Sequence, residues 1–303
     1  MHYIGLWRMQ RVIADIGGEY RFLDLPEPAE LLMPGIRWGS FEHPLTPAFW
    51  VSQAWMEGEP TSTSFQLGKT LVEEVVVCLL GGHGAPAEVG LAAFARVREE
   101  LAKQNAEVLS YERCESLLLE PLMINGRRVH YRFARQRAKY LAASLQALKA
   151  IDEDKLDDVD FRDALCRLPG IGPKTASWIV RNRRGSDEVA ILDVHIVRAC
   201  QIMSVFPERS DPSRNYRELE ARFLEFCLSA RARASVMDST IWGTMRKLSK
   251  RLLNLLVDPT GCLDDSLPLF QAGRGTCQEA AAAEGTRLRA VEAEAAGNLR
   301  IRA

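Results

Sequence analysis

The stretch Leu168-Pro169-Gly170-Ile171-Gly172-Pro173-Lys174 lies between two segments of helical pattern. Two glycines around one apolar residue predict a tight hairpin, because glycine adopts backbone conformations that other residues avoid. The backbone N–H groups of such a turn can point outward at a phosphate. Lys174 and the N-terminus of the next helix add positive potential at the same place. We therefore expect this hairpin to contact a phosphate.

A second stretch, Ile191-Leu192-Asp193-Val194-His195-Ile196-Val197-Arg198, follows downstream, and Asp193 lies 19 positions after Lys174. Asp193 is placed to cap a helix, because aspartate accepts hydrogen bonds from the first free amides of a helix. Two interpretations stay open for each residue. Lys174 either reacts as an amine or contacts a phosphate, and Asp193 either acts in catalysis or only caps its helix. Their joint occurrence favours catalysis.

The rest of the chain predicts a mainly α fold, since alternating strand patterns are scarce. Helices are expected over residues 65–80, 86–103, 135–151, 160–167, 174–181, 193–203, 216–228 and 237–257. Residues 1–60 are rich in Trp, Pro and Gly and predict an irregular packed segment with a few short helices. The composition drifts after Gly261 toward Ala and Glu, which predicts either a surface helix or a frayed tail.

The composition is that of an ordinary folded protein, with 303 residues, 47% of them hydrophobic and 26% charged. No apolar run approaches the roughly 18 residues of a membrane span. The first ten residues lack the apolar region and cleavage site of a secretion signal. Seven scattered cysteines form no Cys-x-x-Cys pair, which favours a reducing cytoplasm and disfavours a zinc site.

The net charge of −1 conceals a local asymmetry. Six basic residues and no acid lie between positions 127 and 139, namely Arg127, Arg128, Arg132, Arg135, Arg137 and Lys139. Residues 152–163 are instead mostly acidic. Either run can be a solvated surface. The basic run can also be a phosphate-contacting stripe, since local potential steers nucleic acid. Arg135 and Arg137 are our candidate DNA contacts.

The two quoted stretches, LPGIGPK and LDVH, resemble the signature of the helix-hairpin-helix DNA glycosylases, and within them the branch that acts on 8-oxoguanine. The resemblance extends over about residues 65–256. It implies that Lys174 is the nucleophile and Asp193 the catalytic aspartate. It also implies that the hairpin Gly170-Ile171-Gly172 holds a DNA phosphate through backbone amides.

The resemblance further implies a wedge loop at residues 81–85, with His83 where the family often has Asn or Gln. Asp238 and Trp242 are four residues apart, share a helix face, and would line the base pocket. We expect two helical lobes around a central cleft that binds DNA and the base. The expected parts are an N-terminal segment 1–60, a lobe 61–160 with the basic stripe and wedge, a catalytic lobe 161–257 and a tail 258–303.

These residue types fit a definite chemistry. The glycosidic carbon is unreachable in a stacked duplex, so the nucleotide must be flipped out. A neutral lysine amine can attack that carbon, and an aspartate can stabilise the positive charge that develops on the sugar. The resulting imine acidifies the adjacent carbon, so β-elimination would follow. We therefore predict base excision repair by a glycosylase with lyase activity on an oxidised purine, most specifically 8-oxoguanine.

Two alternatives stay open, namely a glycosylase for another damaged or modified base, which could serve an antiphage operon, and a non-enzymatic helix-hairpin-helix DNA-binding protein. The expected partner is duplex DNA, and the expected form is a cytoplasmic, nucleoid-associated monomer without membrane contact. Only Cys262 and Cys277 lie where iron–sulfur relatives carry four closely spaced cysteines. We therefore predict no cluster and no other cofactor, with room only for a monovalent cation at the hairpin.

Overall fold

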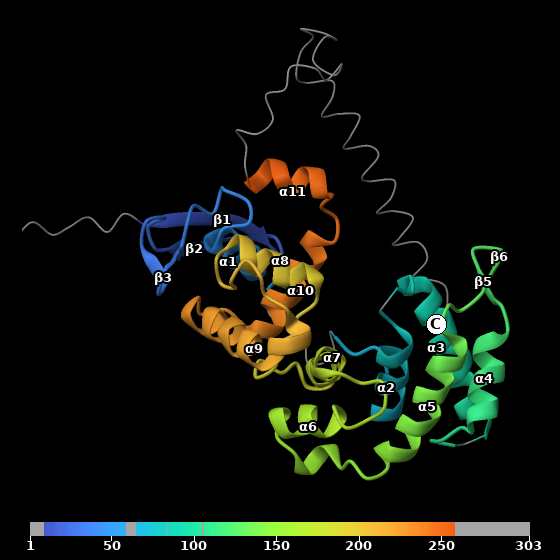
Figure 1. The fold of residues 1–303 in the computed structure, drawn as a ribbon. Helices are drawn as coiled ribbons and strands as arrows, with labels where there is room; N and C mark the ends of the chain where they lie inside the picture. Colours follow the sequence, from blue (N-terminus) through green and yellow to red (C-terminus); the bar gives the residue numbers. More distant parts are fainter. Residues whose placement is uncertain (1–8, 59–64, 83, 105, 258–303) are drawn as a thin grey trace, which may run out of the picture. The chain divides into compact units, whose positions relative to one another are not determined.

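The computed structural model describes residues 9–58, 65–82, 84–104 and 106–257 (Figure 1). The chain divides into two units, residues 1–257 and 258–303, and all the described residues belong to the first. Within the described residues the helices are α1 Pro47–Glu57, α2 Leu71–Leu80, α3 Ala87–Gln104, α4 Tyr111–Leu119, α5 Ala134–Leu148, α6 Asp158–Leu165, α7 Pro173–Arg184, α8 Val194–Ile202, α9 Pro212–Ser229, α10 Ala234–Met245, α11 Lys250–Val257 and the 3-10 helix Glu153–Lys155.

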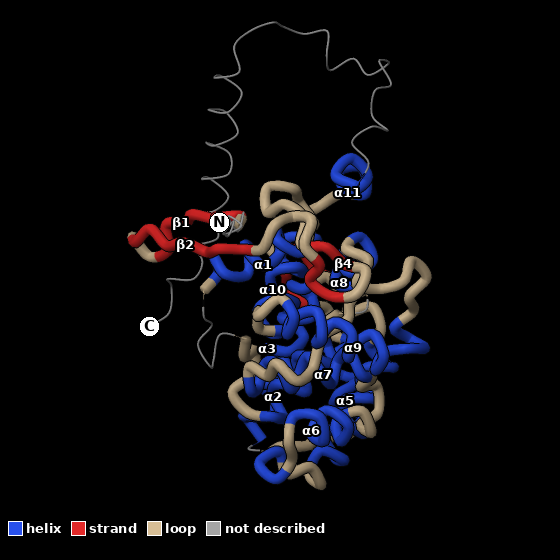
Figure 2. The backbone as a smooth tube through the Cα atoms, turned by 90° about the vertical axis from the view of Figure 1, so that its left-hand side faces the viewer, coloured by secondary structure: helices blue, strands red, loops and turns tan. Residues whose placement is uncertain are grey.

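The fold is mainly α, as the sequence predicts, and Figure 2 shows how little of the chain is strand. Three antiparallel two-stranded sheets are formed by β1 Gln10–Ile16 with β2 Glu19–Leu25, β3 Leu31–Met33 with β4 Ile36–Arg37, and β5 Leu122–Ile124 with β6 Arg127–Val129. None of the helices in the described ranges is both long and apolar enough to cross a membrane.

The expectation of short helices in the N-terminal segment is wrong for residues 10–37, which form hairpins. A Gly17-Gly18 turn with positive φ at both residues closes the β1–β2 hairpin, as two-residue turns of this kind require. The strand pattern is hidden in the sequence because the outer face also carries apolar residues. Ile13 and Phe22 are paired across that face and are about 60% exposed each.

The helices predicted after residue 60 are confirmed, although their ends are shifted and one of them is divided into two. The expected helix over 237–257 is wrong as a single element, because α10 ends at Met245 and α11 begins at Lys250. Ser249 begins the second helix, since its hydroxyl accepts a hydrogen bond from the Leu252 amide at 3.2 Å. Helix α4, which the sequence did not predict, starts at a similar serine cap at Ser110.

Two hydrophobic clusters form the core of the described residues. One is built by α2 to α7 and reaches from Val75 to Val189. The other joins the N-terminal strands and α1 to α8, α9, α10 and α11, with Trp50 fully buried in it. The residues of this cluster between Val12 and Ala54 pack with helices from the far end of the described sequence. The second cluster includes residues directly before and within α8, the helix that follows Asp193.

Candidate active site

The predicted hairpin connects α6 to α7 and is fixed on α5. Gly170 has φ +80°, and a Cβ atom there would lie 2.5 Å from the ring of Tyr140. The Ser144 hydroxyl donates a hydrogen bond to the Pro169 carbonyl at 2.7 Å. Glycine is therefore required at position 170 for two reasons, its backbone conformation and the close approach of α5.

The outer side of the hairpin is open. A Cβ atom at Gly172 would meet nothing within 4 Å, and Gly172 caps α7 without a side chain. Ile171 differs from its glycine neighbours, because its side chain is buried in the core and only its main chain could reach a ligand. Phosphate contact by Gly170, Ile171 and Gly172 stays a prediction.

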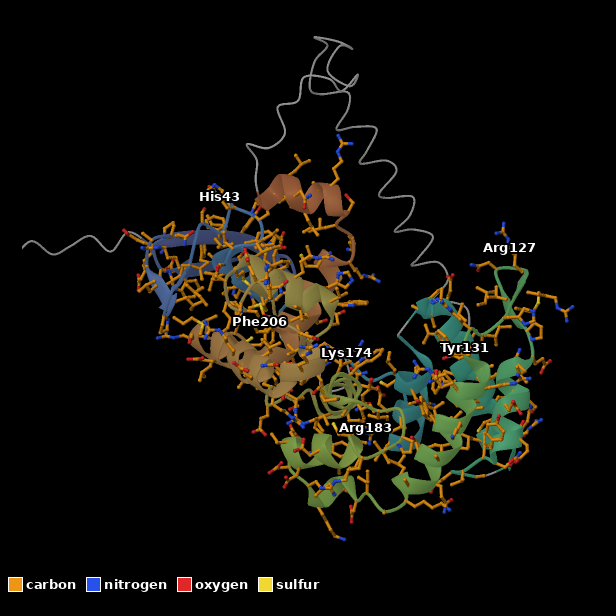
Figure 3. The ribbon with its side chains drawn as sticks, in the orientation of Figure 1. His43, Arg127, Tyr131, Lys174, Arg183 and Phe206 are labelled. Atoms are coloured by element: carbon orange, nitrogen blue, oxygen red, sulfur yellow. The ribbon has the colours of Figure 1, made fainter. Side chains whose placement is uncertain are left out.

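Lys174 is the second residue of α7, and Figure 3 labels its side chain beside this helix. Its side chain is half-buried and forms no ion pair with any residue in the described ranges. The helix itself is held from its other end, because the buried Glu74 of α2 accepts a hydrogen bond from Asn182 at 2.7 Å. α7 packs against α2 and α6 (Figure 1).

Asp193 caps α8, which confirms the predicted local role. Its Oδ1 atom accepts hydrogen bonds from the amides of His195 at 2.8 Å and Ile196 at 3.0 Å. The second carboxylate oxygen has no hydrogen bond to any residue that the structure describes. An aspartate held in this way keeps a fixed orientation and one free oxygen. The catalytic role of Asp193 stays a prediction.

The segment before Asp193 is connected to α7 through α9. Glu220 of α9 accepts hydrogen bonds from the Ser177 hydroxyl at 3.2 Å and from the Ala190 amide at 3.0 Å. Tyr216, one turn earlier, contacts the same segment at the Ala190 carbonyl and the Leu192 amide. The sequence analysis did not identify these two residues. The only signal was their spacing of four, which places a polar pair on one helix face.

Asp238 is buried in α10 and pairs with Arg181 of α7 at 3.2 Å. Burial raises the pKa of Asp238 to about 7, against the opposing effects of Arg181 and the Ile191 backbone, while the negative charge of Asp193 raises it further. The ion pair is imperfect, since Asp238 Oδ2 and Arg181 Nε have no hydrogen bond within the described part of the chain.

Trp242 is 44% exposed, whereas Asp238 on the same helix is buried. The guanidinium of Arg246 lies 4.5 Å from the centre of the Trp242 ring, so one side of that ring already has a cation over it. A role of Asp238 and Trp242 in a base pocket stays a prediction. His83, the candidate wedge, lies outside the described residues.

The predicted DNA contacts of α5 differ in exposure. Arg135 is exposed and pairs with Glu115 of α4 at 3.2 Å. Arg137 is half-buried and lies near Tyr131, where its charge opposes the rise that burial causes in the pKa of that hydroxyl. Among the described residues, neither arginine forms a hydrogen bond or an ion pair with Lys174 or Asp193. Both remain candidates for phosphate contact on α5, the helix that also packs against the hairpin.

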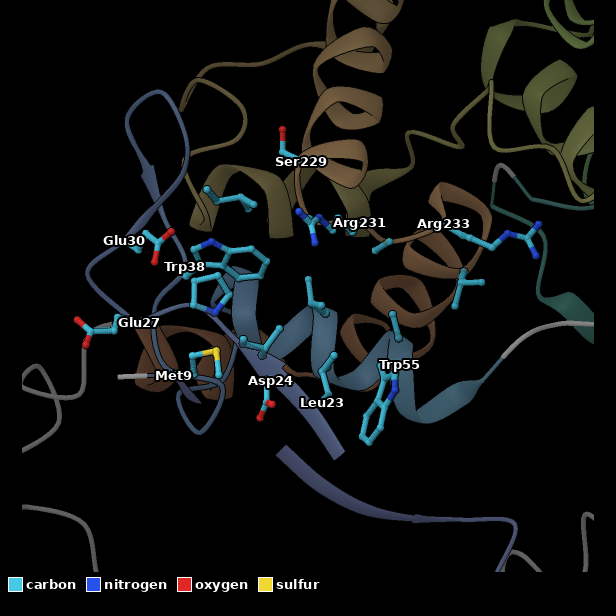
Figure 4. Close-up of a pocket in the computed structure, with 18 of the residues that line it drawn as sticks. Met9, Leu23, Asp24, Glu27, Glu30, Trp38, Trp55, Ser229, Arg231 and Arg233 are labelled. Atoms are coloured by element: carbon cyan, nitrogen blue, oxygen red, sulfur yellow. The ribbon is translucent and has the colours of Figure 1, made fainter. Parts of the chain in front are cut away.

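A groove of about 1260 Å³ lies elsewhere, between the N-terminal strands, α1 and the α9–α10 connection (Figure 4). Trp38 and Trp55 line it, and Lys174 and Asp193 do not. Among the residues described, no group of three or more His, Cys, Asp and Glu side chains is arranged to hold a metal ion.

A hairpin between two helices, followed by a lysine at one helix N-terminus and an aspartate at another, defines a helix-hairpin-helix protein. The chain belongs to the 8-oxoguanine DNA glycosylase family, whose model matches residues 62–232, more than half of its length. This match confirms the resemblance drawn from the two signature stretches. No curated protein matches the chain.

Solved structures of that activity are similar to it. The 8-oxoguanine DNA glycosylase of Methanocaldococcus jannaschii is 25% identical, with 67% of this chain and 96% of that chain covered and a TM-score of 0.50. The enzyme of Thermotoga maritima is 23% identical, covers 65% and 86%, and has a TM-score of 0.45. The 8-oxoguanine glycosylase/lyase of Clostridium acetobutylicum is 12% identical, covers 80% and 89%, and has a TM-score of 0.42.

Proposed function

We propose that this protein excises 8-oxoguanine from duplex DNA and then cleaves the strand, with Lys174 as nucleophile and Asp193 as the assisting carboxylate. Membership of the 8-oxoguanine DNA glycosylase family supports the substrate class. The observation that carries the catalytic assignment is the pair of helix ends. Lys174 lies at the open start of α7, and Asp193 keeps one oxygen free at the start of α8.

The proposed reaction begins with a flipped nucleotide. The neutral amine of Lys174 forms a bond to the sugar C1′ as the glycosidic bond breaks. The departing purine takes the electron pair of that bond, and the proton that the attacking nitrogen loses balances the proton that the purine gains. The Asp193 carboxylate stabilises the positive charge on the sugar. The sugar ring opens to an imine with Lys174. Loss of a C2′ proton and departure of the 3′ phosphate then cleave the strand, and water releases the lysine.

Reductive trapping tests this proposal, because borohydride converts the imine to a stable amine. Duplexes carrying 8-oxoguanine opposite each of the four bases are incubated with the protein and borohydride. We expect a covalent complex with the parent protein and at least about a 100-fold loss with Lys174→Gln. Lys149→Gln, an exposed lysine at the end of α5, is the matched control and should trap like the parent.

Equal trapping by Lys174→Gln and the parent would overturn the lysine assignment. Salt-sensitive DNA binding without trapping or base release on any lesion would instead establish a non-enzymatic DNA-binding protein. A panel of duplexes with other oxidised or modified bases tests the substrate. A misfitting exocyclic group leaves buried pocket groups unpaired, so we expect one base to be strongly preferred.

A further inference from the structure

One face of α9 links the two elements that carry the proposed catalytic groups. Tyr216 and Glu220 are one turn apart on this helix and are 7% and 4% exposed. Their partners include α7 and the segment before α8, both far from α9 in the sequence. A polar pair buried at such a junction needs an explanation beyond the stability of its own helix.

Glu220 connects to the helix of Lys174. Its Oε1 atom accepts hydrogen bonds from the Ser177 hydroxyl at 3.2 Å and the Ala190 amide at 3.0 Å. Ser177 lies three residues after Lys174, so it is almost one turn further along α7. The Oε2 atom accepts hydrogen bonds from Arg162 and Arg217. The carboxylate is thereby fixed on one side by two cations and bridges α7 to residue 190 on the other.

Tyr216 connects to the segment that ends in Asp193. Its hydroxyl donates a hydrogen bond to the Ala190 carbonyl at 2.7 Å and accepts one from the Leu192 amide at 3.3 Å. Two side chains of α9 therefore satisfy three backbone groups over residues 190–192. Asp193 follows directly in the chain. Its own position is consequently determined by α9 as well as by the helix that it caps.

We propose that Tyr216 and Glu220 are positioning residues that set the place of Asp193 relative to Lys174. This inference rests on the proposed function. Without the Tyr216 hydroxyl, a carbonyl and an amide near Asp193 lose their buried partner, and the segment must move to satisfy them. A displacement of about 1 Å in a reacting group can cost about 100-fold in rate. Tyr216 and Glu220 need not touch the DNA.

The test uses Tyr216→Phe, which keeps the buried ring and removes only the hydroxyl. We expect a fall of about 10- to 100-fold in the single-turnover rate of base removal, with the affinity for lesion duplex unchanged. If Tyr216 acts through Asp193, its effect should vanish in the Asp193→Asn background. The double variant should then react within about threefold of Asp193→Asn alone.

Tyr131→Phe is the matched control. Tyr131 is buried like Tyr216, and its hydroxyl donates a hydrogen bond to a backbone carbonyl, that of Leu80, in the other hydrophobic cluster. We expect the Tyr131→Phe and Asp193→Asn effects on rate to multiply. Glu220→Gln provides a second variant, which keeps the size of the side chain and removes its charge, and it should also show no further loss when combined with Asp193→Asn.

Amide hydrogen exchange in the free protein supplies a readout that does not need activity. Tyr216→Phe should speed exchange at Leu192, His195 and Ile196, and Tyr131→Phe should leave these amides unchanged. Unchanged exchange together with multiplying effects on rate would overturn the positioning role. If the parent removes no base, the proposed function fails, and the exchange result alone then decides whether α9 holds this segment.

Discussion

At the scale of single residues, the two glycines of the hairpin have different functions. Position 170 cannot hold a side chain, because its φ is positive and the ring of Tyr140 occupies the space of a Cβ atom. A Cβ atom at Gly172 would meet nothing within 4 Å. In the sequence both positions are glycines between predicted helices, and nothing there distinguishes their two roles. Gly170 therefore fixes the fold of the hairpin, and Gly172 leaves its outer surface clear.

Asp238 provides a prediction of pH dependence. Because burial raises its pKa to about 7 in the folded protein, the native state keeps a proton that the unfolded chain releases near pH 4. The contribution of Asp238 to the free energy of unfolding should therefore fall as pH rises from about 4 to about 7, and level off above. Chemical denaturation across this range measures it, with Asp238→Asn as the comparison.

The difference in unfolding free energy between the parent and Asp238→Asn should decrease across that window. A constant difference from pH 4 to 8, or a change confined to lower pH, would show that Arg181 keeps Asp238 ionised in the native state.

At the scale of elements, the acidic run at residues 152–163 is explained by its neighbours. Asp157 caps α6 by accepting from the Asp160 amide at 2.8 Å. Glu153 and Asp158 pair with Arg183 and Arg184 at the C-terminal end of α7. The run is thus a set of caps and ion pairs that hold the end of α7 opposite to Lys174. Charge pattern alone did not distinguish this role from a solvated surface.

The basic stripe on α5 yields a prediction about DNA affinity. If Arg135 and Arg137 contact phosphates, replacing either with Gln should weaken binding to all duplexes. Each replacement should also reduce the salt slope, that is, the slope of log binding constant against log salt concentration, by about one. Arg214→Gln, at the start of α9 and 83% exposed, is the control and should leave the slope unchanged. Titrations of a fluorescent duplex over a range of salt concentrations measure the slope. If neither variant alters the slope, Arg135 and Arg137 do not contact DNA phosphates.

At the scale of the whole described molecule, the N-terminal segment is part of the core. Trp50 is fully buried in the cluster that also contains residues of α8, including Ile196 three residues after Asp193. We expect Trp50→Ala to cost about 3–5 kcal/mol of unfolding free energy, since a large buried ring is lost. Trp242→Ala, which removes a 44% exposed ring, should cost much less. Denaturant unfolding compares the two, and equal losses would contradict the assigned core.

The sequence by itself determined the mainly α class, the hairpin, the Asp193 cap and the family, because each depends on residues close together in the chain. Only the tertiary structure revealed that α9 joins α7 to the segment before Asp193, that Asp238 faces Arg181, and that residues 10–54 share a core with α8 to α11. These features depend on contacts between residues about 30 to 200 positions apart. Helical periodicity reports which face of an element is buried, and it carries no information about which distant element covers that face.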